Sequence, residues 1–246
     1  MPALALLVLA LLGLAAELAP SDLTGRFGAV VRIPARMELS WLGELDVTYQ
    51  SVLLIDAREL DGKLLQRHVA CDITLLDETP VADLEVEWER AEAVAERTYP
   101  VELEGERYRA DLGIRWIGVE RGVRGELPKE PDAPGVIDAE RDGDPGATID
   151  VKTPVGGLRI FVVQRDHPVL EGTVESPDYI TGTTHLLELE QEVLGSAPPL
   201  PRPEVRTVPY EGRATFEAFR VPEGITCAEL ERQWPRYLER ARGSAR

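Results

Sequence analysis

The chain contains few cysteines, histidines and aromatic residues, and it lacks the motifs of several large enzyme classes. Its 246 residues include 2 Cys, 3 His and only 6% Phe, Trp and Tyr. No Gly-x-Gly-x-x-Gly or Walker-type loop is present, which argues against a nucleotide cofactor. No Gly-x-Ser-x-Gly marks a hydrolase nucleophile, and the sparse aromatic residues argue against a carbohydrate-stacking platform. The sequence therefore identifies no catalytic residue.

Positive charge is also scarce. The chain has 27 Lys and Arg against 44 Asp and Glu, which gives a net charge of −17 and a pI near 4.7. A surface with this excess of negative charge repels phosphate backbones and anionic lipid headgroups. We therefore expect no nucleic-acid partner, and we interpret the acidity as a source of solubility or of attraction for cations.

A long hydrophobic run occurs at the N-terminus, where residues 3–16 are uninterruptedly apolar. Its roughly 14 residues fit the core of a signal peptide and are short for a membrane span. We predict a signal peptide over residues 1–19, with cleavage after Ala15 or Ala16, and a secreted or periplasmic mature chain without a membrane span. The alternative is a buried or membrane-anchoring helix.

The two cysteines, Cys71 and Cys227, are interpreted in the light of this export prediction. An even number of cysteines in an oxidising compartment favours a disulfide. A metal-binding pair is disfavoured because no His or Cys stands near either residue at ligand spacing. Two buried free thiols are the alternative.

Two long strands are predicted on either side of Asp61-Gly62, a dipeptide that permits the positive φ angles of a tight hairpin turn. The flanking runs each exceed ten residues, and long one-sided antiparallel strands suit a curled sheet or barrel. In the second run, alternation predicts one face with Leu65, Val69, Cys71, Ile73 and Leu75 and an opposite face with His68, Asp72 and Thr74.

Two helices are predicted. Residues 89–97 are rich in Ala, Glu and Arg, which favour a helix, although strand is the alternative there. Near the C-terminus, Thr226 and Glu229 have the spacing of a capping box, in which each side chain satisfies a backbone amide at the start of a helix. We therefore predict a C-terminal helix over residues 225–242.

The remaining strand-like runs define the fold class. Residues 120–150 hold many Gly and Pro residues and are predicted as a loop, and residues 197–203 form a proline-rich connector. About eight to ten strands, mostly adjacent in sequence, predict an all-β fold. We expect residues 20–246 to form a single domain, an antiparallel up-and-down or meandering β-barrel with a C-terminal helix.

The plan of the chain resembles that of lipocalins, a family of calycin-type barrels. The segment "LTGRFGAV" resembles the Gly-x-Trp entry strand of that family, with Phe27 in place of the Trp, and "SPDYI" at residues 176–180 resembles its second motif. Lipocalins often tie an early-middle strand to a segment after the barrel, as a bridge between Cys71 and Cys227 would. The resemblance implies a barrel that holds a small apolar ligand.

Six apolar residues are the candidates for a ligand site in the barrel interior. Barrels of this size can hold one small ligand, and they can also be filled completely by side chains. Both outcomes stay open for the predicted lining residues, which are Phe161, Val163, Leu187, Leu189, Phe216 and Phe219.

An acidic segment is the candidate metal site. Asp138, Glu140, Asp142 and Asp144 offer hard oxygen ligands at alternate positions, as calcium prefers. The first three match positions of the EF-hand loop, but Ile149 stands where the bidentate Glu is required and no helices are predicted beside the loop. A calcium-binding turn and a solvated turn both remain interpretations, and calcium is the only cofactor that we consider.

The three histidines, His68, His167 and His185, have no spacing that requires zinc.

Taken together, the export signal and the barrel predict an exported binding protein for a small apolar ligand or a protein partner. The first alternative is a structural or interaction protein with a calcium-stiffened loop, and the second is a hydrolase whose site is not visible in the sequence.

Overall fold

The computed structural model describes residues 18–39, 43–77, 85–88, 97–153, 156–199 and 205–245. These residues form one antiparallel sheet of 12 strands with one α-helix near the C-terminus, which confirms the predicted all-β fold class. The N-terminal half contains η1 (Pro20–Leu23), β1 (Gly25–Leu39), β2 (Gly43–Leu60), β3 (Lys63–Asp77), β4 (Glu85–Trp88), β5 (Arg97–Glu104), β6 (Arg107–Asp111) and β7 (Arg115–Ile117). The C-terminal half contains β8 (Ala147–Thr153), β9 (Gly156–Ser176), β10 (Tyr179–Ala197), β11 (Val205–Pro209), β12 (Thr215–Arg220) and α1 (Cys227–Ser244).

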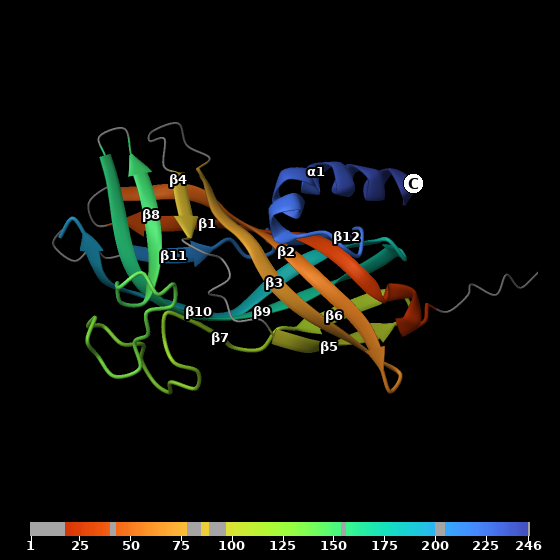
Figure 1. Cartoon of the computed structure of the whole chain (residues 1–246), viewed down its shortest axis with the longest axis horizontal. Coiled ribbons are helices and arrows are strands. Elements are labelled where there is room, and N and C mark those ends of the chain that lie inside the picture. The colour runs from red at the N-terminus through yellow and green to blue at the C-terminus, as the bar shows by residue number, and fades with distance from the viewer. Residues whose placement is uncertain are drawn as a thin grey trace, which may run out of the picture.

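Eight strands close into a ring at one end of the sheet. The order around the ring is β12, β1, β2, β3, β5, β6, β9 and β10, and β10 returns to β12 (Figure 1). Strand closure leaves no unpaired edge at this end, which we call the closed end.

The other end of the sheet, which we call the open end, is built differently. There β4 and β8 lie between β3 and β9, and β11 takes the place of β12 beside β1 (Figure 1). The β10–β12 ladder ends at Thr183, and Thr184 donates one further backbone hydrogen bond to Ala214. In the described part of the chain no ladder joins β10 to β11, so a seam separates these two strands.

The hairpin between β2 and β3 confirms the predicted turn. Asp61 and Gly62 have φ angles of 51° and 72°, as a two-residue turn with two positive φ angles requires. Farther along the hairpin, the register shifts so that Cys71 is an extra residue opposite the Val52–Leu53 step.

This shift corrects the predicted faces of β3. On the turn side of Cys71 the residues that face the interior are Leu64, Gln66, His68 and Ala70, all of which are buried. Cys71 itself faces outward, and beyond it the inward and outward positions are exchanged. Ile73 and Leu75 therefore face inward. The prediction that His68 lies on the face opposite the core is therefore wrong.

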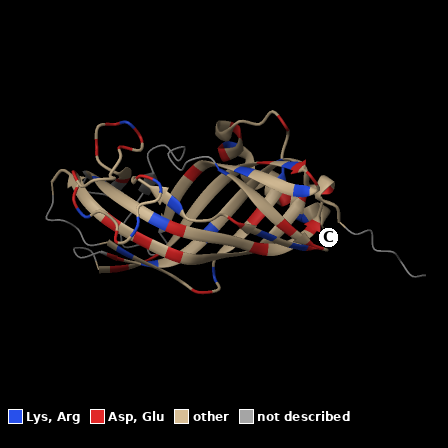
Figure 2. Ribbon diagram, turned by 90° about the horizontal axis from the view of Figure 1, so that it is seen from below, with Lys and Arg blue, Asp and Glu red and all other residues tan. Residues whose placement is uncertain are grey.

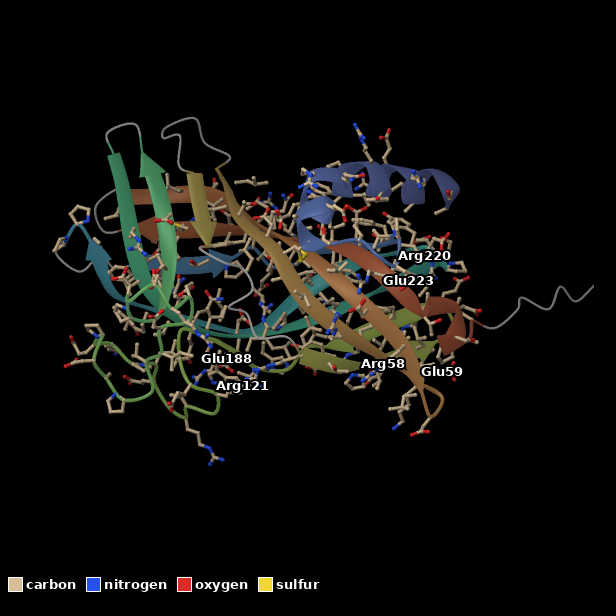
Figure 3. All side chains as sticks on the ribbon, viewed as in Figure 1. Arg58, Glu59, Arg121, Glu188, Arg220 and Glu223 are labelled. Carbon is tan, nitrogen blue, oxygen red and sulfur yellow. A yellow bond between two sulfur atoms is a disulfide. The ribbon has the colours of Figure 1, made fainter. Side chains whose placement is uncertain are left out.

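Side chains fill the closed end and seal it. Leu23 of η1 and Phe27 of β1 are almost fully buried there. The guanidinium of Arg220 lies 4.7 Å from the centroid of the Phe27 ring and donates hydrogen bonds to the backbone carbonyls of Asp22 and Thr24. Figure 3 labels Arg220 at this end of the barrel.

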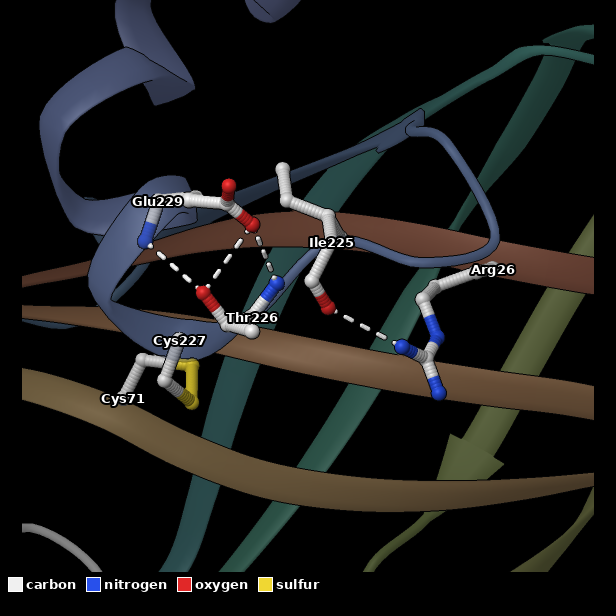
Figure 4. Close-up of a disulfide and its surroundings, with 6 residues drawn as sticks. All are labelled: Arg26, Cys71, Ile225, Thr226, Cys227 and Glu229. Atoms are coloured by element: carbon white, nitrogen blue, oxygen red, sulfur yellow. Dashed lines mark hydrogen bonds between the residues drawn. A yellow bond between two sulfur atoms is a disulfide. The ribbon is translucent and has the colours of Figure 1, made fainter.

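Helix α1 lies outside the barrel and is joined to it by a disulfide (Figure 4). Cys71 and Cys227 are bonded, with their Cα atoms 5.0 Å apart, as predicted. Thr226 and Glu229 form the predicted capping box, and the helix begins at Cys227. Among the described residues, no helical segment combines the length and the hydropathy that a bilayer crossing requires.

Three predictions lie wholly or partly outside the described residues. The predicted signal peptide falls almost entirely on residues 1–17, and the predicted helix falls on residues 89–96, although its last residue, Arg97, begins β5. The proline-rich connector falls on residues 200–203, and its first residue, Ala197, ends β10.

Candidate functional site

A cavity of about 80 Å³ lies inside the barrel between the closed and open ends, and we call it the waist cavity. It occurs where β9 changes partner from β6 to β7 and where β1 changes partner from β12 to β11. Its apolar lining is Ile33, Ile73, Ile117, Leu186, Leu189 and Pro209, and its polar lining is Tyr49, Ser51, Arg115, Gln164, Asp166, Gln191 and Thr207.

An ion pair between Arg115 and Asp166 is the main polar feature of the waist cavity. The two residues are direct neighbours in the β7–β9 ladder, so that their side chains meet. Nε of Arg115 donates to Oδ1 of Asp166 at 2.5 Å, and Nη2 donates to Oδ2 at 2.9 Å. Gln164 also donates to Oδ2, at 2.7 Å, and accepts from Gln191 at 3.4 Å.

The environment keeps Arg115 charged. Burial lowers the pKa of Arg115, but the charge and the hydrogen bonds of Asp166 outweigh this effect and raise the pKa above its usual value. The Asp166 side chain is only 2% exposed, whereas that of Arg115 is 25% exposed, as expected for a side chain bordering a cavity. No acceptor among the described residues binds Nη1 of Arg115, so the amino group remains available to a ligand.

A second polar group lies next to the pair, within the closed end. The side-chain oxygen of Gln66 accepts from the Tyr108 hydroxyl at 2.7 Å and lies 3.1 Å from Nε2 of His68. Because that oxygen is an acceptor, Nε2 of His68 carries the proton and Nδ1 is bare. Burial, together with the nearby charge of Arg115, lowers the pKa of His68 to about 3, so its imidazole is neutral at physiological pH.

The waist cavity lies beside the seam between β10 and β11 and shares lining residues with a groove at the surface. A groove of about 500 Å³ follows this seam, and we call it the seam groove. Its walls come from β10, β11 and the loop of residues 118–146. The residues that line both the seam groove and the waist cavity are Leu189, Gln191, Thr207 and Pro209.

An irregularity in β10 explains which of its side chains line the waist cavity. The β9–β10 register shifts between Leu186 and Leu189, which leaves two β10 residues without a partner on β9. Both Leu186 and Leu189 consequently line the waist cavity, and Leu187 points to solvent with 63% of its surface exposed.

Comparisons with protein-family models, with curated proteins and with solved structures find no match for this chain. The resemblance to lipocalins therefore stays a prediction, and the arguments about function rest on the geometry of this structure alone.

Of the six residues predicted to line a ligand site, only Leu189 lines the waist cavity. Phe216 faces the interior but belongs to the filled closed end, and Leu187 is exposed. The other three, Phe161, Val163 and Phe219, lie on the outer face of the sheet.

The outer positions have a physical reason. Phe161 and Val163 of β9 pack beneath the loop of residues 118–146, against Val119 and Leu127, and Phe219 packs beneath α1. These strands are therefore covered on both faces. Along such strands, the residues that point inward and those that point outward are both apolar. Alternation therefore cannot distinguish the interior from the exterior.

Arg165 links this loop to the barrel. Arg165 of β9 pairs with Glu188 and Glu190 of β10, and its Nη1 donates to the backbone carbonyl of Gly125 in the loop at 3.0 Å. Figure 3 labels Glu188 on the side of the barrel where the loop lies. Elsewhere, Figure 2 shows acidic and basic residues interleaved along the strands.

The acidic segment lies in the same loop, and its carboxylates are already engaged. Ligand oxygens of Asp138, Glu140 and Asp142 lie within 4.8 Å of one another. However, Asp138 accepts hydrogen bonds from three backbone amides, and Asp142 accepts from Thr148 and pairs with Arg159. Arg159 also pairs with the fourth predicted ligand, Asp144, at 2.7 Å. Calcium binding stays a prediction.

Glu140 differs from the other acids because it is buried. Its side chain is 3% exposed, and Oε1 accepts a hydrogen bond from the amide of Thr148 at 3.3 Å. Burial raises the pKa of Glu140 to about 7. Apart from this acidic segment, the described residues bring together no group of His, Cys, Asp and Glu with metal-site spacing, so the three histidines remain apart.

Sequence reasoning missed the four polar residues Arg115, Gln164, Asp166 and Gln191. A signal for two of them was present, because Gln164 and Asp166 continue the inward parity of Ile160 and Val162 along β9. Polar residues at core-facing parity are unusual in a barrel and indicate a buried network. The partner, Arg115, could not be identified in this way because it is about 50 residues distant.

Proposed function

We propose that this protein is an exported binding protein for a small, largely apolar molecule. One end of the molecule would occupy the waist cavity, and the rest would lie in the seam groove. The observation that carries this proposal is that the two spaces are adjacent and share the lining residues Leu189, Gln191, Thr207 and Pro209.

The sizes of the two spaces support an elongated ligand. Pockets that enclose a drug-sized molecule measure roughly 300–1,000 Å³. The waist cavity, at about 80 Å³, can hold only a small end group, whereas the seam groove, at about 500 Å³, falls within that range. The filled closed end leaves the open end for the ligand.

The nature of the lining supports a binding role. Apolar walls with a few oriented polar groups are typical of small-molecule sites. Leu186, Leu189 and Pro209 supply the walls, and Arg115 supplies a charged donor inside them. Export rests on the apolar N-terminal run and agrees with the disulfide, which persists in oxidising compartments.

Titration with N-phenyl-1-naphthylamine, an uncharged apolar fluorophore, tests the proposal. We expect saturable binding at micromolar concentration. Leu189→Trp should weaken binding at least tenfold, because the indole would fill the junction between the waist cavity and the seam groove.

Leu187→Trp is the matched control, since Leu187 lies two residues away on the same strand and points to solvent. It should leave the affinity unchanged. An absence of saturable binding, or equal losses in both variants, would contradict a site at this junction. No particular observation favours the two alternatives, a calcium-stiffened structural protein and a hydrolase, and both stay predictions.

A further inference from the structure

We infer that the waist cavity selects a ligand whose buried end is an uncharged hydrogen-bonding group, such as a primary carboxamide or a hydroxyl, over one that ends in a carboxylate. This inference rests on the proposed function. It follows from the charge balance and the unused hydrogen-bonding groups of the Arg115–Asp166 pair.

The charge balance is the first step. Asp166 is almost fully buried and binds the guanidinium of Arg115 through two hydrogen bonds, so the pair is neutral as a unit. A ligand carboxylate beside this unit would place two negative charges against one positive charge in a desolvated site. A buried charge without a compensating partner is strongly unfavourable, and no second cationic residue lines the waist cavity.

The unused hydrogen-bonding groups are the second step. Nη1 of Arg115 is a donor without an acceptor among the described residues. Gln191 donates to Gln164 through Nε2, and its own side-chain oxygen accepts from none of the described residues. The site therefore offers at least one donor and one acceptor, which a carboxamide or a hydroxyl can satisfy together.

The apolar lining sets the rest of the ligand. Leu186, Leu189 and Pro209 line the waist cavity, and Leu127, Leu189 and Val205 are apolar residues of the seam groove. Burial of alkyl surface against these residues contributes most of the affinity. The ligand class is therefore a neutral amphiphile, with an alkyl or similarly apolar body and one polar end.

Competition between two probes of equal chain length tests the inference. Octanamide and octanoate should each be titrated against bound N-phenyl-1-naphthylamine at pH 7.5. In the wild-type protein we expect octanamide to bind at least tenfold more tightly than octanoate. Asp166→Asn keeps the shape of the side chain but removes its charge and leaves Arg115 uncompensated, so the preference should reverse.

Glu175→Gln is the matched control. Glu175 is an exposed residue of β9, the strand of Asp166, and lines neither the waist cavity nor the seam groove; its replacement changes the net charge by the same amount as Asp166→Asn. It should leave the preference for octanamide intact.

The outcomes separate this inference from the proposed function. If the fluorophore binds but neither probe displaces it, or if octanoate binds as tightly as octanamide, the selectivity inference is wrong and the binding site stands. A folded Asp166→Asn variant with an unchanged preference would also overturn it. If the fluorophore does not bind, both proposals are wrong. The wild-type comparison needs no variant, so it decides the charge argument even if Asp166→Asn does not fold.

Discussion

The two ends of the barrel differ in how their strands pair and in how their interiors are filled. At the closed end eight strands pair around a full ring, and the interior is filled by side chains such as Phe27 and Phe216. At the open end β10 and β11 separate, and the interior contains the polar pair Arg115–Asp166 and a cavity. The disulfide and α1 lie against the outer face of the closed-end strands (Figure 1).

This difference indicates that the two ends of one sheet contribute differently to stability. Side chains that pack tightly on all sides contribute most to stability, whereas cavities and buried polar groups reduce it. Residues at functional sites are often held at such a cost. We therefore expect the closed end to contribute most of the free energy of unfolding. This stability allows the open end to keep a cavity and a buried polar pair for binding.

Truncation of one apolar residue at each end provides the largest expected contrast. Phe216 is 1% exposed and packs in the closed end, so Phe216→Ala should cost about 3–5 kcal/mol in the free energy of unfolding. Leu189 already borders a cavity and a groove, so Leu189→Ala should cost about 1 kcal/mol. Urea unfolding of the two variants measures both costs.

Equal losses in these variants would break the comparison. They would mean that the open end is packed as tightly as the closed end and that the waist cavity is not part of the protein in solution. Leu187→Ala, at the exposed position of the same strand, should change the free energy of unfolding by less than about 0.5 kcal/mol.

Acidification should destabilise the closed end through His68. The folded protein does not protonate this imidazole until the pH approaches 3, whereas the unfolded chain does so near pH 6.5. The stability is therefore complete above pH 6.5 and is lost as the pH falls. Between pH 6.5 and 4.5 the contribution of His68 to the free energy of unfolding should fall by about 2 kcal/mol, which urea unfolding at a series of pH values measures.

A non-titrating variant isolates this effect. His68→Gln retains a donor for Gln66, so it should remove about 2 kcal/mol of the change between pH 6.5 and 4.5 without unfolding the protein. The side chain of His185 is half exposed. His185→Gln should therefore leave the loss of stability at low pH as it is in the wild-type protein. If the wild-type protein and both variants lose the same stability at low pH, His68 is solvated rather than buried.

Local signals in the sequence predicted the parts of the fold that depend on neighbouring residues. The Asp61-Gly62 turn and the capping box at Thr226 each act within four residues, and the structure confirms both. The disulfide was predicted because only two cysteines exist. The overall barrel followed from the length and alternation of the strands.

Most of the candidate site depends on contacts that are distant in sequence. The extra residue at Cys71 reverses the parity of β3, and nothing near His68 in the sequence reveals this reversal. Phe161 and Phe219 are apolar because a loop and a helix cover the outside of the barrel. The pairing of Arg115 with Asp166 is set by the β7–β9 register, which spans the whole loop of residues 118–146.

An increase in pH should act on the open end, and with the opposite sign to its effect at His68. Glu140 is protonated in the folded protein up to about pH 7, whereas the unfolded chain loses that proton near pH 4.5. Its contribution to stability is complete below pH 4.5 and is lost as the pH rises through 7. Glu140→Gln keeps an acceptor for the amide of Thr148, so it should stabilise the protein at pH 8 by about 2 kcal/mol.

Thermal unfolding at pH 8 in the presence of EDTA measures this smaller effect. Glu120→Gln, at an exposed position of the same loop, should leave the Tm unchanged and controls for the loss of one negative charge. Because Arg159 already pairs with Asp142 and Asp144, calcium should not change the Tm of the wild-type protein. A rise in Tm with millimolar calcium that Asp142→Ala abolishes would instead establish the calcium site that the sequence suggests. The loop at the open end would then be held by an ion rather than by Arg159.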